Sequence, residues 1–364
     1  MRINKATVFV LGFTLTLLGV SILGSYTLEK PQFPGLKRFW MYQSPSTNFF
    51  PTALQLEAWA TQQIESRDQH VIIVGGSSVL MGVGQPVQDS ISEKLQELLG
   101  KEFKVLNLAL RGGATYGQGQ YIATSLVKKG YKVTFISDVF INYVPPYQNN
   151  SPYQKTYWQA RYAGMLSPMN QIDKQIKVSI SNLDRLLGFL NEKLRYQELA
   201  NYISYNFFPL TQSLAIGDQS LQPLKSYPDI EPNTPYEKRY LNPEWEESQL
   251  KMVESNASNN YPDKDLRKTA IDTKAGFDRK FSPSILLVAC KYNPRYVNKI
   301  EPLIKENYYS NIERQLNFYK LFGLDARNTC DDFTDRDYSD GTHLSVEGAQ
   351  KLATILSEWI TNGE

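Results

Sequence analysis

Short apolar segments alternate with amphipathic segments in two parts of the chain. Residues 71–74 form an apolar run that ends at Gly75 and Gly76, a pattern typical of a buried strand that enters a tight turn. Residues 89–99 have helical spacing and stop at Gly100, which suits the end of a helix. The alternation continues with a strand at 103–108, a helix at 121–129 and a strand at 133–141.

The same alternation returns near the C-terminus. It predicts a strand at 284–289, a helix at 297–322, a short strand near Leu324 and a last helix at 345–361, for which Ser345 is a suitable N-cap. Strands that alternate with helices form parallel sheets with helices on both faces. We therefore predict an α/β fold, a three-layer α/β/α sandwich with a five-stranded parallel sheet, flavodoxin-like in class.

Residues 149–281 interrupt this order, and we interpret them as a mostly helical insertion or lid. Within them, residues 227–268 are rich in Pro, Asn, Glu and Lys and resemble a long polar surface loop. The stretch at 157–207 is amphipathic, with apolar residues at helical spacings: Ile176, Ile180, Leu183, Leu187 and Leu190.

The N-terminal residues form a long apolar run. Between Ala6 and Leu28 there is no charged residue, and the run is long enough to span a bilayer as an uncleaved anchor. A cleaved signal peptide is the alternative, although residues 21–25 match a cleavage site only weakly. Basic residues lie on both sides of the run, but large domains that follow an N-terminal span are translocated largely regardless of local charge. We expect a single-pass membrane protein with an extracytoplasmic catalytic domain.

This interpretation divides the chain into five segments. They are a membrane anchor at 1–28, a stalk with a packing helix at 29–69, the first part of the α/β domain at 70–148, the insertion at 149–281 and the second part of the α/β domain at 282–364.

Charge and cysteine content narrow the possible partners. The formal net charge is +2, from 39 basic and 37 acidic residues, so the protein has no broad positive field for a polyanion and nucleic acid is not an expected partner. Cys290 and Cys330 are the two cysteines. The sequence leaves open whether they pair in an oxidising compartment or remain buried thiols.

Two serines follow the first predicted strand, in the sequence Gly75-Gly-Ser-Ser78. A side chain at that place lies at the carboxyl end of the sheet, where open parallel sheets bind ligands. A phosphate-binding loop is a poor alternative, because the glycine spacing differs and the P-loop lysine is missing. The remaining alternative is a plain turn in which Ser77 or Ser78 caps a helix.

A histidine and a carboxylate lie close together near the C-terminus, in Asp340-Gly-Thr-His343. A serine hydroxyl needs an imidazole to accept its proton, and the imidazole needs a carboxylate to orient it. The chain has two histidines, and His70 lies at the opposite end of the first strand, away from the expected ligand edge. We therefore predict a catalytic triad of Ser78, His343 and Asp340.

These motifs and their order resemble the SGNH (GDSL-like) hydrolase superfamily. The resemblance covers residues 70–145 and 282–362. Gly76-Ser-Ser78 matches the nucleophile block, with Ser77 where the family usually has Asp, and Asp340-Gly-Thr-His343 matches the last block. The resemblance implies a serine nucleophile and requires no metal or organic cofactor.

The resemblance also implies an oxyanion hole. Its donors are expected to be the backbone N–H groups of Ser78 and Gly112 and the side chain of Asn142. The family pattern around the last of these is Gly-x-Asn-Asp, whereas this chain has Phe140-Ile-Asn-Tyr143, so both flanking signature residues differ.

The activity implied is that of a serine-dependent ester hydrolase. Its expected substrate is an acyl ester, either an O-acyl group on an envelope glycan or a lipid ester. One alternative is an O-acyltransferase of an exported polysaccharide, in which a sugar hydroxyl replaces water. Another is a non-catalytic binding or assembly protein, with the insertion as a surface for an envelope protein partner.

Overall fold

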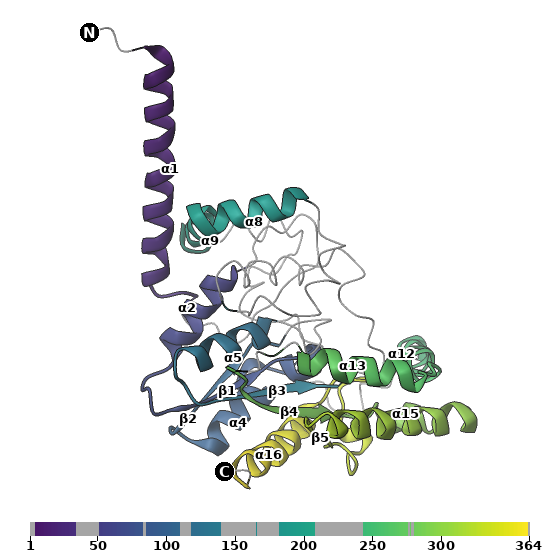
Figure 1. Ribbon diagram of the computed structural model, residues 1–364. Helices are drawn as coiled ribbons and strands as arrows, with labels where there is room; N and C mark the ends of the chain where they lie inside the picture. Colours follow the sequence, from purple (N-terminus) through teal and green to yellow (C-terminus); the bar gives the residue numbers. More distant parts are fainter. Residues whose placement is uncertain are drawn as a thin grey trace.

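A single parallel sheet forms the centre of the computed structural model, which describes residues 4–33, 51–82, 85–109, 118–139, 165, 182–207, 243–275, 277 and 280–362. The sheet has five strands in the order β2-β1-β3-β4-β5, all parallel, which confirms the predicted flavodoxin-like α/β fold (Figure 1). The strands are β1 (His70–Val74), β2 (Phe103–Asn107), β3 (Val133–Asp138), β4 (Ser284–Ala289) and β5 (Asp325–Asn328).

Alternate residues of the strands point to opposite helical layers. Ile72 and Val74 of β1 pack with α4 (Ile91–Leu99) and α16 (Val346–Asn362). Val71 and Ile73 pack on the other face with α2 (Ala53–Gln63) and α5 (Gln118–Lys128). On that same face α15 (Pro302–Leu321) covers β4 and β5. The chain therefore forms the three-layer sandwich that its apolar runs predict.

One predicted helix begins later than expected. The range 297–322 contains the end of a short helix, α14 (Pro294–Val297), and then α15, which starts at Pro302. Proline fits the first turn of a helix and interrupts the interior of one, because it has no backbone N–H. The helix predicted from residue 297 therefore begins at Pro302.

The polar segment of the insertion is mostly helical where the structure describes it. The prediction of a surface loop at 227–268 is wrong for α12 (Pro243–Ala257) and the start of α13 (Asp263–Ala275), while 227–242 lies outside the described residues. A narrow apolar stripe explains the difference: Leu250, Val253 and Ala257 pack with the helices beside β4 and β5. Tertiary packing here outweighs a polar composition.

The amphipathic part of the insertion is helical from residue 182 onward. It forms α8 (Asn182–Leu194) and α9 (Tyr196–Phe207), whereas 157–181 lies outside the described residues apart from Met165. Whether the insertion acts as a lid stays a prediction.

The apolar N-terminal run forms α1 (Lys5–Glu29), a helix of 25 residues. Within the part of the chain that the structure describes, it is the one helix long and apolar enough to cross a membrane, with a mean hydropathy of 2.2. Its first half projects away from the rest of the protein, and its second half contacts α9 and α8 (Figure 1).

Candidate active site

The turn after β1 presents Ser78 at the carboxyl edge of the sheet. Gly76 adopts a left-handed conformation with φ +83°, which other residues rarely adopt, and the chain then enters the short helix α3 (Ser78–Met81). The Ser77 hydroxyl accepts a hydrogen bond from Val79 N and so caps this helix. Ser78, the next residue, is half-buried and is turned towards the C-terminal loop.

Three side chains form one hydrogen-bonded line at this edge. Ser78 Oγ lies 2.9 Å from His343 Nε2, and His343 Nδ1 lies 2.6 Å from Asp340 Oδ2. The structure thus brings together the three residues that the two sequence motifs single out. With Nδ1 protonated towards the carboxylate, Nε2 is the nitrogen that is able to accept the serine proton.

Asp340 is buried, but its surroundings favour the ionised carboxylate. Its Oδ1 accepts hydrogen bonds from the backbone N–H groups of Thr342 and His343, both at 2.7 Å. Burial alone would raise the pKa of Asp340, but the charge and hydrogen bonds of His343 and the bond from Thr342 outweigh it and lower the pKa. The carboxylate is therefore available to orient the imidazole at neutral pH.

A second buried carboxylate, Asp138, supports the serine turn. Its Oδ1 accepts a hydrogen bond from Ser77 N at 2.8 Å, and its Oδ2 accepts one from the Ser77 hydroxyl. Asp138 is the last residue of β3, which pairs with β1, and a Cβ on Gly76 would lie 2.0 Å from its Oδ1. Burial raises the pKa of Asp138 to about 6, although the bonds from Ser77 act against this. Asp138 thus fixes the residue that precedes Ser78.

Replacing Asp138 with Asn should change how stability depends on pH. The folded protein binds the carboxyl proton of Asp138 more tightly than the unfolded chain does. The protonated carboxyl therefore contributes stability at low pH, and about 3 kcal/mol of this stability is lost as the pH rises from 3.8 to about 6. Asn keeps an acceptor for Ser77 N and does not ionise. The free energy of unfolding of Asp138→Asn relative to the native protein should therefore rise over that pH range, as measured by chemical unfolding at pH 4.5 and pH 7.5. If the unfolding free energies of Asp138→Asn and the native protein differ by the same amount at both pH values, the raised pKa of Asp138 is contradicted.

The loop that carries Asp340 and His343 is closed at its base. Tyr338 and Leu344 form an antiparallel bridge, and Ser339 N donates to His343 O at 2.8 Å. Asn293, fully buried after β4, holds the loop from the side: its Nδ2 donates to Asp340 O at 3.1 Å.

The insertion also contacts this loop. Gln249 of α12 accepts a hydrogen bond from Gly341 N at 3.0 Å, and a Cβ on Gly341 would lie 2.8 Å from Met252 Cε. Sequence patterns did not single out Gln249, because it lies in the segment expected to be a loop. Through this contact, α12 supports the loop that carries Asp340 and His343.

Gln249→Ala should weaken catalysis without abolishing it. The change leaves the Gly341 N–H without this partner, at a typical cost of about 1–3 kcal/mol, and frees the loop between Asp340 and His343. We expect kcat for a soluble ester to fall by about tenfold, a 1.4 kcal/mol effect on the barrier. Glu247→Ala, on the same helix and with a side chain 64% exposed, is the matched control and should leave kcat unchanged. Equal kcat values for the two variants would show that α12 does not position the loop.

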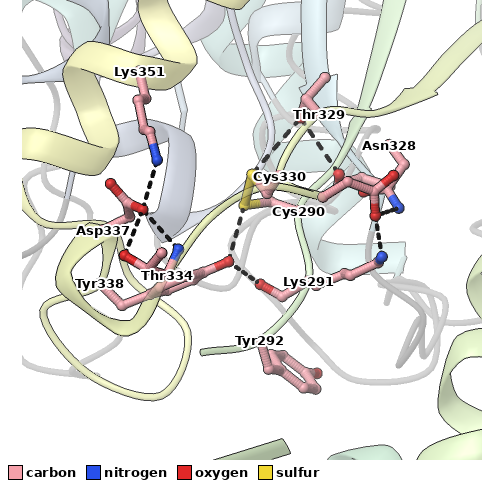
Figure 2. The surroundings of a disulfide bond; sticks show 12 residues. Cys290, Lys291, Tyr292, Asn328, Thr329, Cys330, Thr334, Asp337, Tyr338 and Lys351 are labelled. Carbon is pink, nitrogen blue, oxygen red and sulfur yellow. Dashed lines mark hydrogen bonds and ion pairs between the residues drawn. A yellow bond between two sulfur atoms is a disulfide. The ribbon is translucent and has the colours of Figure 1, made fainter. Parts of the chain in front are cut away.

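A disulfide joins the segment after β4 to the segment after β5. Cys290 and Cys330 are bonded, with Cα atoms 4.9 Å apart, which settles the question that the sequence left open (Figure 2). Tyr338, at the base of the loop that carries Asp340 and His343, lies beside this bond and donates a hydrogen bond to Lys291 O at 2.7 Å. Lys351 and Asp337 form an ion pair at 2.9 Å on the other side of Tyr338. The disulfide therefore braces the base of the loop.

The other predicted site residues are placed as follows. Gly112 and Asn142 lie outside the described residues, so their roles as oxyanion donors stay predictions. The backbone N–H of Ser78 makes no hydrogen bond to any described residue.

His70 begins β1 at the far edge of the sheet, where its Nε2 lies 2.9 Å from Thr134 Oγ1. Among the described residues, no group of three His, Cys, Asp or Glu side chains is placed to hold a metal ion.

Comparison with known proteins gives similar folds only. No protein-family model and no curated protein matches the chain. Similar solved structures include a carbohydrate acetylesterase from Sinorhizobium meliloti, at 11% identity over 81% of this chain and 100% of that chain, with a TM-score of 0.34. Another is the inhibitor-bound aryl esterase of M. Smegmatis, at 12% identity over 80% of this chain and 99% of that chain, with a TM-score of 0.33.

The fold itself is established by the strand order of the parallel sheet. The serine after β1 and the Asp–His pair after β5 belong to the two motifs that carry the resemblance to SGNH hydrolases, and the fold brings these motifs together.

Proposed function

We propose that this protein is a serine ester hydrolase in which Ser78 is the nucleophile, His343 the general base and acid, and Asp340 the residue that orients His343. The observation that supports this most directly is the line of hydrogen bonds from Ser78 Oγ through His343 to Asp340 Oδ2. Hydrogen-bond contact between a nucleophile, a base and an orienting carboxylate is the arrangement that activates a serine.

The reaction proceeds in two halves. Ser78 Oγ attacks the ester carbonyl while His343 Nε2 takes its proton, and the tetrahedral oxyanion is held by the backbone N–H of Ser78, with Gly112 and Asn142 as the further proposed donors. Collapse breaks the bond to the alcohol, which leaves with the proton from His343. Water then attacks the acyl-serine, gives its proton to His343, and the carboxylic acid leaves as the Ser78 hydroxyl is restored.

The substrate we propose is an acyl ester on the outer side of a membrane, either on an envelope glycan or on a lipid. Two features support this location. The apolar helix α1 has the length of a membrane span, and disulfides such as Cys290–Cys330 persist in oxidising compartments and are rare in the cytosol. Together they favour a single-pass protein whose α/β domain lies outside the cytoplasm.

A fluorophosphonate probe tests the proposal on the full chain in detergent. An activated serine reacts with the probe, so we expect one phosphonate adduct per chain, which peptide mass spectrometry should locate on Ser78. Denatured protein is the control and should not react. No adduct, or an adduct on another residue, would overturn the assignment of the nucleophile.

A further inference from the structure

The connection between α8 and α9 packs directly on α1. Ser21 Oγ of α1 donates a hydrogen bond to Lys193 O at 3.0 Å. A Cβ on Gly24 would lie 2.4 Å from Arg195 O, so only glycine allows this approach of the two backbones. Arg195 itself is in a left-handed conformation with φ 54°, which turns the chain from α8 into α9 against α1.

At the level of the Gly24 contact, the side of α1 that faces away from the turn exposes apolar side chains. Ile22 is 67% exposed and Leu23 is 54% exposed, although both lie next to the residues that contact the turn. Tyr26 and Lys30, which form a cation–π pair at 4.3 Å, follow at the end of the helix and are residue types that mark a membrane surface. At about 1.5 Å per residue, Gly24 lies about 9 Å along the helix from Lys30. The turn therefore contacts α1 within the leaflet that borders the domain.

Helix α8 leaves this turn crosswise to α1 (Figure 1). It exposes Leu186 to 52% and Phe189 to 45%, one helical turn apart. Lys193 lies one turn further along the same face and is placed over the Phe189 ring at 5.8 Å. A helix with an apolar face and cations at its rim is the kind that lies in a membrane surface, buried by about 5–10 Å.

We propose that α8 lies in the plane of the bilayer that α1 crosses, with Leu186 and Phe189 among the acyl chains and the long side chain of Lys193 extending to the headgroups. The depth of the α8–α9 turn on α1 matches the depth of such a helix. The occupant of this surface is lipid because α8 joins the apolar helix α1 at a level where α1 itself exposes apolar residues. The inference rests on α1 as a membrane span and is independent of the ester chemistry. A crosswise helix of this kind would fix the tilt of the domain over the membrane, which a single span alone does not.

Site-directed spin labelling of the full chain in lipid nanodiscs tests this placement. Labels go on Leu186→Cys and Phe189→Cys, with Leu15→Cys in α1 as the control inside the bilayer. Leu303→Cys in α15 is the aqueous control, since Leu303 is an equally apolar and 66% exposed helix residue far from α1. The native cysteines are bonded to each other and do not take the label. The measurement is the collision rate of each label with oxygen, which concentrates in lipid, and with a soluble nickel chelate.

We expect the labels at 186 and 189 to collide mainly with oxygen, as at 15, and the label at 303 mainly with nickel. If 186 and 189 resemble 303 while 15 is in lipid, the placement of α8 is overturned and the anchor stands. If the labels at 186 and 189 are shielded from both reagents, α8 packs against protein, and its placement in the bilayer is also overturned. If 15 is itself aqueous, the anchor fails and the inference fails with it.

Discussion

Ser78→Ala should lower kcat/KM for a soluble ester by about 10⁵- to 10⁶-fold, because removal of the nucleophile from a Ser–His–Asp enzyme leaves only binding and oxyanion stabilisation. His343→Ala should lose a similar amount, and the double variant should be no worse than either single one, because the two residues act as a unit. Release of p-nitrophenol from p-nitrophenyl acetate by the full chain in detergent measures all three. Ser78 is half-buried at a turn, so the methyl group of alanine should be accommodated and the unfolding curve should not move.

Ser77→Ala is the matched control for this experiment. It removes the neighbouring hydroxyl, which bonds Asp138 and caps α3 and does not contact His343. Ser77→Ala should therefore reduce stability by about 1–3 kcal/mol and keep measurable turnover. If Ser77→Ala is inactive and Ser78→Ala is not, the nucleophile has been assigned to the wrong serine.

Removal of the disulfide should produce the largest loss of stability. Cys290 and Cys330 are separated by 40 residues, and a crosslink that closes a loop of this length restricts the unfolded chain by about 4 kcal/mol. We expect Cys290→Ala combined with Cys330→Ala to lower the free energy of unfolding in guanidinium by about that amount. Activity should fall as well, because Tyr338 beside the bond carries the base of the catalytic loop.

Reduction of the native protein provides the control for the double alanine variant. Dithiothreitol breaks the same crosslink without deleting side-chain volume, so the reduced protein and the variant should unfold at similar guanidinium concentrations. Dithiothreitol should not change the unfolding of the variant. An unfolding free energy within about 1 kcal/mol of the native value in both cases would show that the crosslink adds little to stability.

The strands and the Ser–His–Asp set could be predicted because each depends on a local pattern. The apolar runs at 71–74 and 284–289 match β1 and β4 closely, since a strand buried on both faces has few polar positions. Ser78 occurs in a recognisable motif directly after β1, and His343 occurs in one in the loop that follows β5. Their mutual distance then follows from a parallel sheet, in which the carboxyl ends of all strands share one edge.

Other features of the site depend on which helices and strands become neighbours in the fold, and local sequence patterns do not show these contacts. Asp138 acts on Ser77 only because β3 pairs with β1, although the two residues are 61 apart in the chain. Gln249 lies in a segment whose composition is polar, and a stripe of few apolar residues was enough to fold it. The pairing of the two cysteines likewise needed the positions of their Cα atoms.

The separation of the catalytic residues has a consequence for biosynthesis. Ser78 and His343 are 265 residues apart in the sequence. A chain made from its N-terminus exposes the serine turn long before the residue that activates it exists. Under the proposed mechanism, the unfinished protein therefore carries an unactivated serine, and hydrolysis can begin only after β5 and the loop that follows it have been made and have docked on the sheet.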